Sequence, residues 1–242
     1  MAQKRQEWQH HPPPRPVSRH RKFQNRQAIG SAERAQRKDT AAIYRANWAL
    51  TEATFGNTVE ALSGATKVLA LSTRRSVQAA AALTLGLAGD PARAQALAED
   101  LAKRFPEDTD VQSTVLPTVR IQLILKGNNN ADVMEIVQRT TPYQLELLDQ
   151  LVSTYIRGNA YVAAHRGTEA AAEFQKIVDH PGLVKCGTQG PLALLGLARA
   201  YALQGDTAKA KAAYQDFLTL WKDADPDIPI FIAAKAEYAK LH

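Results

Sequence analysis

Side chains that could carry out catalysis are few in this chain, and none lies in a pattern that a familiar reaction needs. The single cysteine, Cys186, lies in the loop-like run VKCGTQGP, which favours an incidental surface thiol. The acid pairs Glu99–Asp100 and Glu107–Asp108 fall at helix ends or in loops, where solvated charges are expected. Three histidines lack an acid or cysteine partner at helical spacing: His10, His11 and His20. We therefore expect no catalytic residue, no bound metal and no cofactor.

Short catalytic motifs are also missing from the sequence. There is no glycine-rich phosphate loop, no G-x-S-x-G and no H-E-x-x-H, and the run His20-Arg21-Lys22 lacks the aspartate of a kinase catalytic loop. The longest apolar run, residues 79–88, is about half of the roughly 20 residues that a membrane span needs. The basic N-terminus has no apolar segment typical of a signal peptide. These features predict a non-enzyme in the cytoplasm.

Positive charge is concentrated at the N-terminus. Residues 1–40 hold ten lysines or arginines and three acids, a net charge of +7, whereas the other 202 residues carry 20 basic and 21 acidic groups. The proline-rich run HHPPPRP predicts that residues 1–17 form a disordered, partly polyproline-II tail. Such a tail could bind nucleic acid weakly and in a salt-sensitive way, or it could have no partner at all.

Small and apolar residues recur at a long, nearly regular interval. Between Leu194 and Pro226 they fall in the order Leu197-Ala198, Tyr201, Gly205, Ala210, Tyr214 and Phe217-Leu218. A related order lies 40 residues earlier, at Gly158, Tyr161, Ala170, Phe174 and Ile177. Two further copies centre on Ala61 and Ala94, 33 residues apart. This interval resembles that of tetratricopeptide repeats, in which a small residue lets two antiparallel helices cross closely.

The repeat predicts an all-α fold, a tetratricopeptide-type solenoid of helical hairpins over residues 18–242. Residues 18–38, with Ala28 on the same position as Ala61, would be the second helix of a truncated repeat, so the chain would begin partway through a solenoid. Residues 227–242 would form a C-terminal capping helix that covers the exposed flank of the last repeat. Pro117 should kink or restart the helix that contains it.

Three segments extend the resemblance beyond the generic repeat positions. They are LAGDPARAQALAEDLAKRFPEDT (87–109), GTEAAAEFQKIVDHPG (167–182) and GDTAKAKAAYQDFLTLWKDADPDIPI (205–230). They resemble the C-terminal repeat region of certain bacterial serine/threonine protein kinases, over about residues 24–242. That resemblance implies a kinase fragment or a relative without the kinase domain. It implies no kinase activity, because no residue here matches a kinase motif.

Candidate ligand-binding residues follow from the repeat positions that line the groove of such arrays. They are Val152, Tyr155, Asn159, Leu195 and Arg199. Asn159 and Arg199 match the later of two positions that grip carboxylates in some arrays, whereas Tyr155 and Leu195 replace the lysine of the earlier position. A groove of this composition would suit an extended or helical segment with apolar anchors. The alternative is that these residues pack between repeats or face solvent.

The sequence therefore predicts a non-catalytic scaffold that binds a protein or peptide ligand, with residues such as Glu173 and Lys211 on its outer face. One alternative is a detached regulatory or sensor segment of a kinase, for which a broken kinase reading frame upstream would be the sign. The other is a nucleic-acid-associated protein that uses the basic tail, although nucleic acid is the less expected partner. The oligomeric state does not follow from the sequence.

Overall fold

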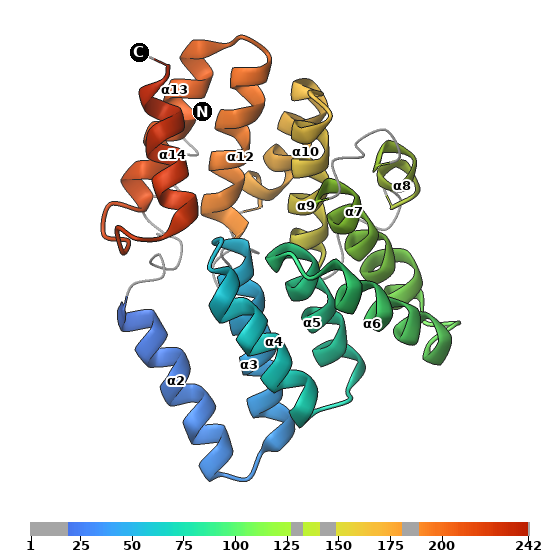
Figure 1. Ribbon diagram of the computed structural model, residues 1–242. Coiled ribbons are helices and arrows are strands. Elements are labelled where there is room, and N and C mark those ends of the chain that lie inside the picture. The colour runs from blue at the N-terminus through green and yellow to red at the C-terminus, as the bar shows by residue number, and fades with distance from the viewer. Residues whose placement is uncertain (1–18, 127–132, 141–148, 181–188, 242) are drawn as a thin grey trace. The chain divides into compact units, whose positions relative to one another are not determined.

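The computed structural model describes residues 19–126, 133–140, 149–180 and 189–241, and every regular element in these ranges is a helix. The helices fall into two compact units, an N-terminal unit within residues 19–143 and a C-terminal unit within residues 144–242 (Figure 1). The all-α prediction is confirmed for the described residues. The tail predicted for residues 1–17, Cys186, His10 and His11 lie outside them.

Helical hairpins build the N-terminal unit, in which each helix packs against the next one along the chain. Its elements are α2 (Arg19–Arg34), α3 (Lys38–Thr54), α4 (Thr58–Leu71), α5 (Arg75–Ala88), α6 (Pro91–Arg104), the π-helical turn η1 (Val111–Val115), α7 (Leu116–Lys126) and α8 (Val133–Thr140). The helix start at Leu116 confirms that Pro117 interrupts its helix. The turn η1 closes on a bond from the Leu116 N–H to the Val111 carbonyl oxygen, and a regular α-helix continues from there.

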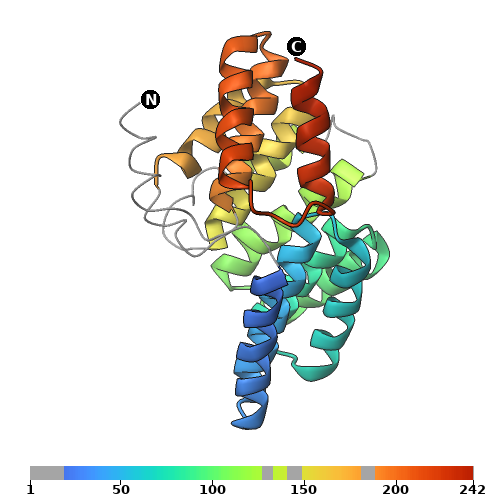
Figure 2. The same ribbon diagram turned by 90° about the vertical axis from the view of Figure 1, so that its left-hand side faces the viewer.

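In residues 149–180 and 189–241, which are the described part of the C-terminal unit, the structure has two hairpins and one further helix. Figure 2 shows the same helices from a second side. The first hairpin is α9 (Asp149–Ala163) with α10 (Gly167–Val178), and the second is α12 (Gln189–Leu203) with α13 (Thr207–Leu220). Helix α12 packs against α9, α10 and α13, so it is the central helix of the unit. The last helix, α14 (Pro229–Ala239), corresponds to the predicted capping helix and packs against α13.

The turns inside the hairpins share one backbone device. A residue with positive φ ends the first helix, at Gly56 (86°), Gly89 (90°), His165 (55°) and Gly205 (75°). Glycine adopts this conformation without the steric cost that a Cβ imposes, so the three glycines suit these turns and His165 is the exception. The N-caps that follow the last two glycines, Asp90 and Asp206, accept hydrogen bonds from the backbone N–H groups of Arg93 and Lys209.

Each of these turns is followed, five residues later, by an alanine that is completely buried. These alanines are the repeated small residues of the sequence: Ala61, Ala94, Ala170 and Ala210. Ala28, expected to share their position, is exposed instead. The buried counterpart in that region is Ala41, five residues after Gln36, whose φ is also positive. The first turn therefore lies between α2 and α3, and Ile29 and Ala32 of α2 are buried.

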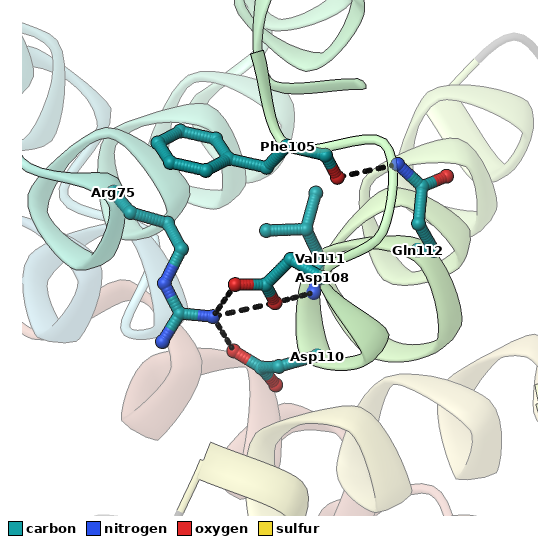
Figure 3. A network of polar contacts seen from close by, with 6 residues as sticks. All are labelled: Arg75, Phe105, Asp108, Asp110, Val111 and Gln112. Atoms are coloured by element: carbon teal, nitrogen blue, oxygen red, sulfur yellow. Dashed lines mark hydrogen bonds and ion pairs between the residues drawn. The ribbon is translucent and has the colours of Figure 1, made fainter. Parts of the chain in front are cut away.

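Two adjacent arginines at the start of α5 connect this helix to the start of α3 and to the start of η1. Arg74 pairs with Asp39 of α3 at 2.7 Å, and both side chains are exposed, so this pair adds little stability. Arg75 Nη1 contacts both Asp108 carboxylate oxygens, at 2.7 and 2.9 Å, and one Asp110 oxygen at 3.1 Å (Figure 3). Asp108 also accepts a hydrogen bond from the Val111 N–H. The Asp108 carboxylate thus caps η1 and ties it to α5.

The buried alanines make a direct test of the helix crossings. Ala210→Leu should overpack the contact between α12 and α13 and lower the free energy of unfolding by roughly 1–3 kcal/mol. Ala208→Leu is the matched control, because Ala208 lies on the same helix and is exposed. Urea unfolding of both variants measures the difference, and equal stability of the two would contradict the packing described here.

Candidate functional site

One aromatic ring sets the distance between the helices that carry the predicted ligand-binding residues. Phe174 of α10 is completely buried, between Gly158 of α9 and Gly196 of α12. A Cβ added at Gly158 would lie 2.6 Å from the ring, and one added at Gly196 would lie 2.5 Å from it. Neither position has room for alanine unless the ring moves. The Tyr155 ring packs against the same phenylalanine, with 5.9 Å between ring centroids.

Arg199 of α12 forms an ion pair with α14, the helix for which the sequence predicts only a capping role. Its Nε and Nη2 donate to the two carboxylate oxygens of Glu237 on α14, each at 2.8 Å. The Tyr214 hydroxyl of α13 donates to Glu237 Oε2 at 2.9 Å. The carboxylate thus accepts three hydrogen bonds from two helices. A guanidinium that binds both oxygens of a carboxylate in this way fixes its orientation as well as its charge.

The electrostatic effects of this cluster are visible in the pKa values of its members. Burial, with the Glu237 charge and hydrogen bond adding to it, raises the pKa of Tyr214 well above its usual range. Burial also raises the pKa of Tyr155, although Arg199 and a hydrogen bond from Asn159, one turn along α9, oppose the shift. Burial acts to lower the pKa of Arg199, but Glu237 outweighs it and the net shift is upward. Both tyrosines therefore stay protonated where a free phenol would ionise.

The structure brings three of the five predicted residues together, because Tyr155 and Asn159 hydrogen-bond to each other and Arg199 acts electrostatically on Tyr155. Val152 lies one turn before Tyr155 on α9 and is half-buried. Tyr155 itself is buried, and Leu195 is completely buried. Leu195 thus has the packing role that was the alternative for these positions. Val152, Asn159 and Arg199 retain partial exposure.

Glu237 and Tyr214 are members of this cluster that the sequence reasoning did not place there. The repeat positions locate residues within a hairpin, whereas Glu237 comes from the helix after the last hairpin. The only signal was its position on the predicted capping helix, three residues after Ala234, which α14 buries. Tyr214 had been assigned to the repeat pattern alone, without a polar role for its hydroxyl.

Glu173, expected on the outer face, is instead buried in an ion pair. Its Oε2 accepts from Arg157 Nη2 of α9 at 2.6 Å, and only 3% of the Arg157 side chain and 9% of the Glu173 side chain are exposed. Lys176 contacts the other carboxylate oxygen at 2.7 Å. Removal of one partner of a buried pair leaves an uncompensated charge, so Glu173 is a structural residue and an unsuitable surface control.

In the part of the chain that the structure describes, no group of three or more His, Cys, Asp or Glu side chains could hold a metal ion. Within the same residues, no helix has both the length and the apolar character required to cross a membrane. Comparison with protein-family models, with curated proteins and with solved structures finds no match for this chain.

Gly196→Ala tests the placement of the ring. The added methyl group would meet Phe174, and we expect the free energy of unfolding to fall by roughly 1–3 kcal/mol even though alanine favours a helix. Gly30→Ala in α2 is the matched control, because its Cβ would meet only the end of the Arg34 side chain, at 3.5 Å. Denaturant unfolding should show opposite effects for the two substitutions, and a stabilised Gly196→Ala variant would refute the contact.

The raised tyrosine pKa values predict a pH effect. Their protonated forms are favoured in the folded chain, so the stability they contribute is complete below a pH of about 10, where a free phenol ionises, and is lost as the pH rises above it. Phenolate absorbance near 295 nm should show fewer ionised tyrosines at pH 11 in the native chain than in urea. Tyr214→Phe should reduce that difference, and an unchanged difference would argue against the burial of its hydroxyl.

Proposed function

We propose that this chain is a tetratricopeptide-type repeat protein that binds a protein or peptide ligand, without catalysis of its own. The observation that carries the proposal is the cluster on α9 and α12, the first helices of two successive hairpins. In repeat arrays of this type the first helices line the binding groove, and the four buried alanines five residues after each turn support that architecture. The cluster combines an apolar side chain, a tyrosine, an amide and an arginine, which suit peptide recognition.

Only some of the five predicted residues are exposed enough to touch a ligand directly. We infer that Val152 and Asn159 make direct contacts, since both are partly exposed on one face of α9. Tyr155 is buried against Phe174 and holds the α9 backbone that carries Val152 and Asn159 in place. Arg199 would contribute its charge from α12, with 25% of its side chain exposed. An extended or helical segment with an apolar anchor fits such a surface.

A photo-crosslinking residue at position 152 tests the proposal in cells that express the chain. We expect it to capture a discrete protein, whereas the same residue at Ala172, exposed on the second helix α10, should not. With the captured protein purified, Asn159→Ala should weaken binding by roughly 1 kcal/mol or more by titration calorimetry. Lys211→Ala on α13 is the matched control. If Lys211→Ala weakens binding and Asn159→Ala does not, the ligand uses the other face.

The resemblance to the repeat region of bacterial serine/threonine kinases supports a more specific form of the same proposal, a regulatory segment that acts with a kinase. The three resembling segments contain the buried alanines Ala94, Ala170 and Ala210, so they fall on the elements that define the hairpins. A kinase among the captured proteins would favour this form. The nucleic-acid alternative stays a prediction, because it rests on residues 1–17, which lie outside the described structure.

A further inference from the structure

Helix α14 meets the hairpin of α12 and α13 through three regularly spaced side chains and through Tyr238, whose ring lies 6.0 Å from that of Tyr214 and whose hydroxyl accepts a hydrogen bond from Gln215. Phe231 lies against Phe217 and Trp221, with ring centroids 6.4 and 6.0 Å apart. Ala234, one turn later, is completely buried, and Glu237, a further turn on, meets Arg199 and Tyr214. The three side chains are three residues apart, and each has its own partner. Phe231 packs on aromatic rings, Ala234 is buried, and the Glu237 carboxylate binds the Arg199 guanidinium.

The charges of the two surfaces are complementary at one defined place. Arg199 donates two parallel hydrogen bonds to Glu237, and Tyr214 adds a third to the same carboxylate. Parallel donors of this kind distinguish a carboxylate from an amide, because an amide nitrogen cannot accept them. The ion pair remains open to solvent, with 25% of the Arg199 side chain and 32% of the Glu237 side chain exposed. A competing carboxylate could therefore reach Arg199.

The contacts of α14 lie on one side of the helix. On its other side Ile232 is 52% exposed, and Lys235 and Ala236 are exposed as well. Residues 221–228, which form turns rather than helix, join α14 to α13. A helical bond from the Trp221 N–H to the Phe217 carbonyl oxygen begins this segment, and the bonds that follow, from Ala224 to Trp221 and from Ile228 to Asp225, are turn bonds. A helix held on one face opens at lower cost than a helix packed on several sides, such as α12.

We propose that α14 occupies a binding surface for a partner's helix. This surface, formed by Arg199, Tyr214, Phe217 and Trp221, takes a helix that presents an aromatic residue, a small residue three positions later and a glutamate three positions after that. The partner helix displaces α14 and repeats its contacts. This inference rests on the proposed function, and it adds the chemistry of the ligand: an amphipathic helix with one carboxylate placed for Arg199.

A fluorescent peptide with the sequence of residues 227–241 tests the inference on the full chain. In the wild-type chain α14 competes with the peptide, so binding should be weak. The double variant Phe231→Ala, Glu237→Gln loosens the internal helix, and fluorescence anisotropy should show the peptide binding about tenfold tighter or more, because a larger fraction of the chain has the surface open. A peptide in which the glutamate is replaced by glutamine is the control for the carboxylate, and its binding should be lost.

Adding Arg199→Gln to the double variant should remove the preference for the glutamate peptide over the glutamine peptide. Equal binding of the peptide to wild type and double variant, absence of binding to both, or equal binding of the two peptides would each overturn the inference. Hydrogen exchange should also show α14 opening faster in the double variant, and unchanged protection would contradict its weak attachment. A further outcome is a protein that is captured at position 152 and binds equally well to the wild type, the double variant and the Arg199→Gln variant. That result would support the proposed function and contradict only this inference.

Discussion

The contact between Phe174 and two glycines is the constraint on which the C-terminal unit depends. The ring lies against the places where Cβ atoms of Gly158 and Gly196 would be. Helices α9 and α12 therefore approach α10 more closely than they could with any residue other than glycine at these two positions. This spacing places Tyr155 against the ring and leaves the Arg199 side chain free to extend toward α14. The ring therefore sets the spacing of the two helices that carry Tyr155 and Arg199.

The local features of the hairpins were predictable from the sequence because local chemistry determines them. Helix α6 begins at Pro91 after the capping residue Asp90, an order that the preferences of aspartate for the N-cap and of proline for the first helical position favour. The exception is informative. His165 takes the backbone conformation that glycine holds in the other turns, and Gln36 does the same before α3. When a residue other than glycine adopts a positive φ, its type does not reveal the turn. The turn at Gln36 could therefore not be recognised, and the sequence places Ala28 rather than Ala41 at the buried alanine position of the first hairpin.

The candidate site was predictable only in part, for a different physical reason. The repeat positions locate Tyr155, Asn159 and Arg199 on first helices, and the structure brings them together. Whether a side chain is exposed depends on helices that are distant in the sequence, so the complete burial of Leu195 could not be read from its own helix. The Arg157–Glu173 pair shows the same limit, since both residues have types that usually face solvent. Glu237 belongs to an element after the repeats, to which the repeat pattern does not extend.

The two glycines beside Phe174 also have a consequence for the growing polypeptide. Glycine weakens an isolated helix, and in α9 and α12 the contact with the ring offsets that cost. When ribosomal synthesis has passed Phe174, one face of the ring still lacks its cover until roughly 20 more residues have been added, which takes about 1–4 seconds. During that interval a large aromatic side chain is open to molecular chaperones. The order of synthesis thus leaves the first hairpin, α9 with α10, complete before the helix that covers its aromatic ring has been made.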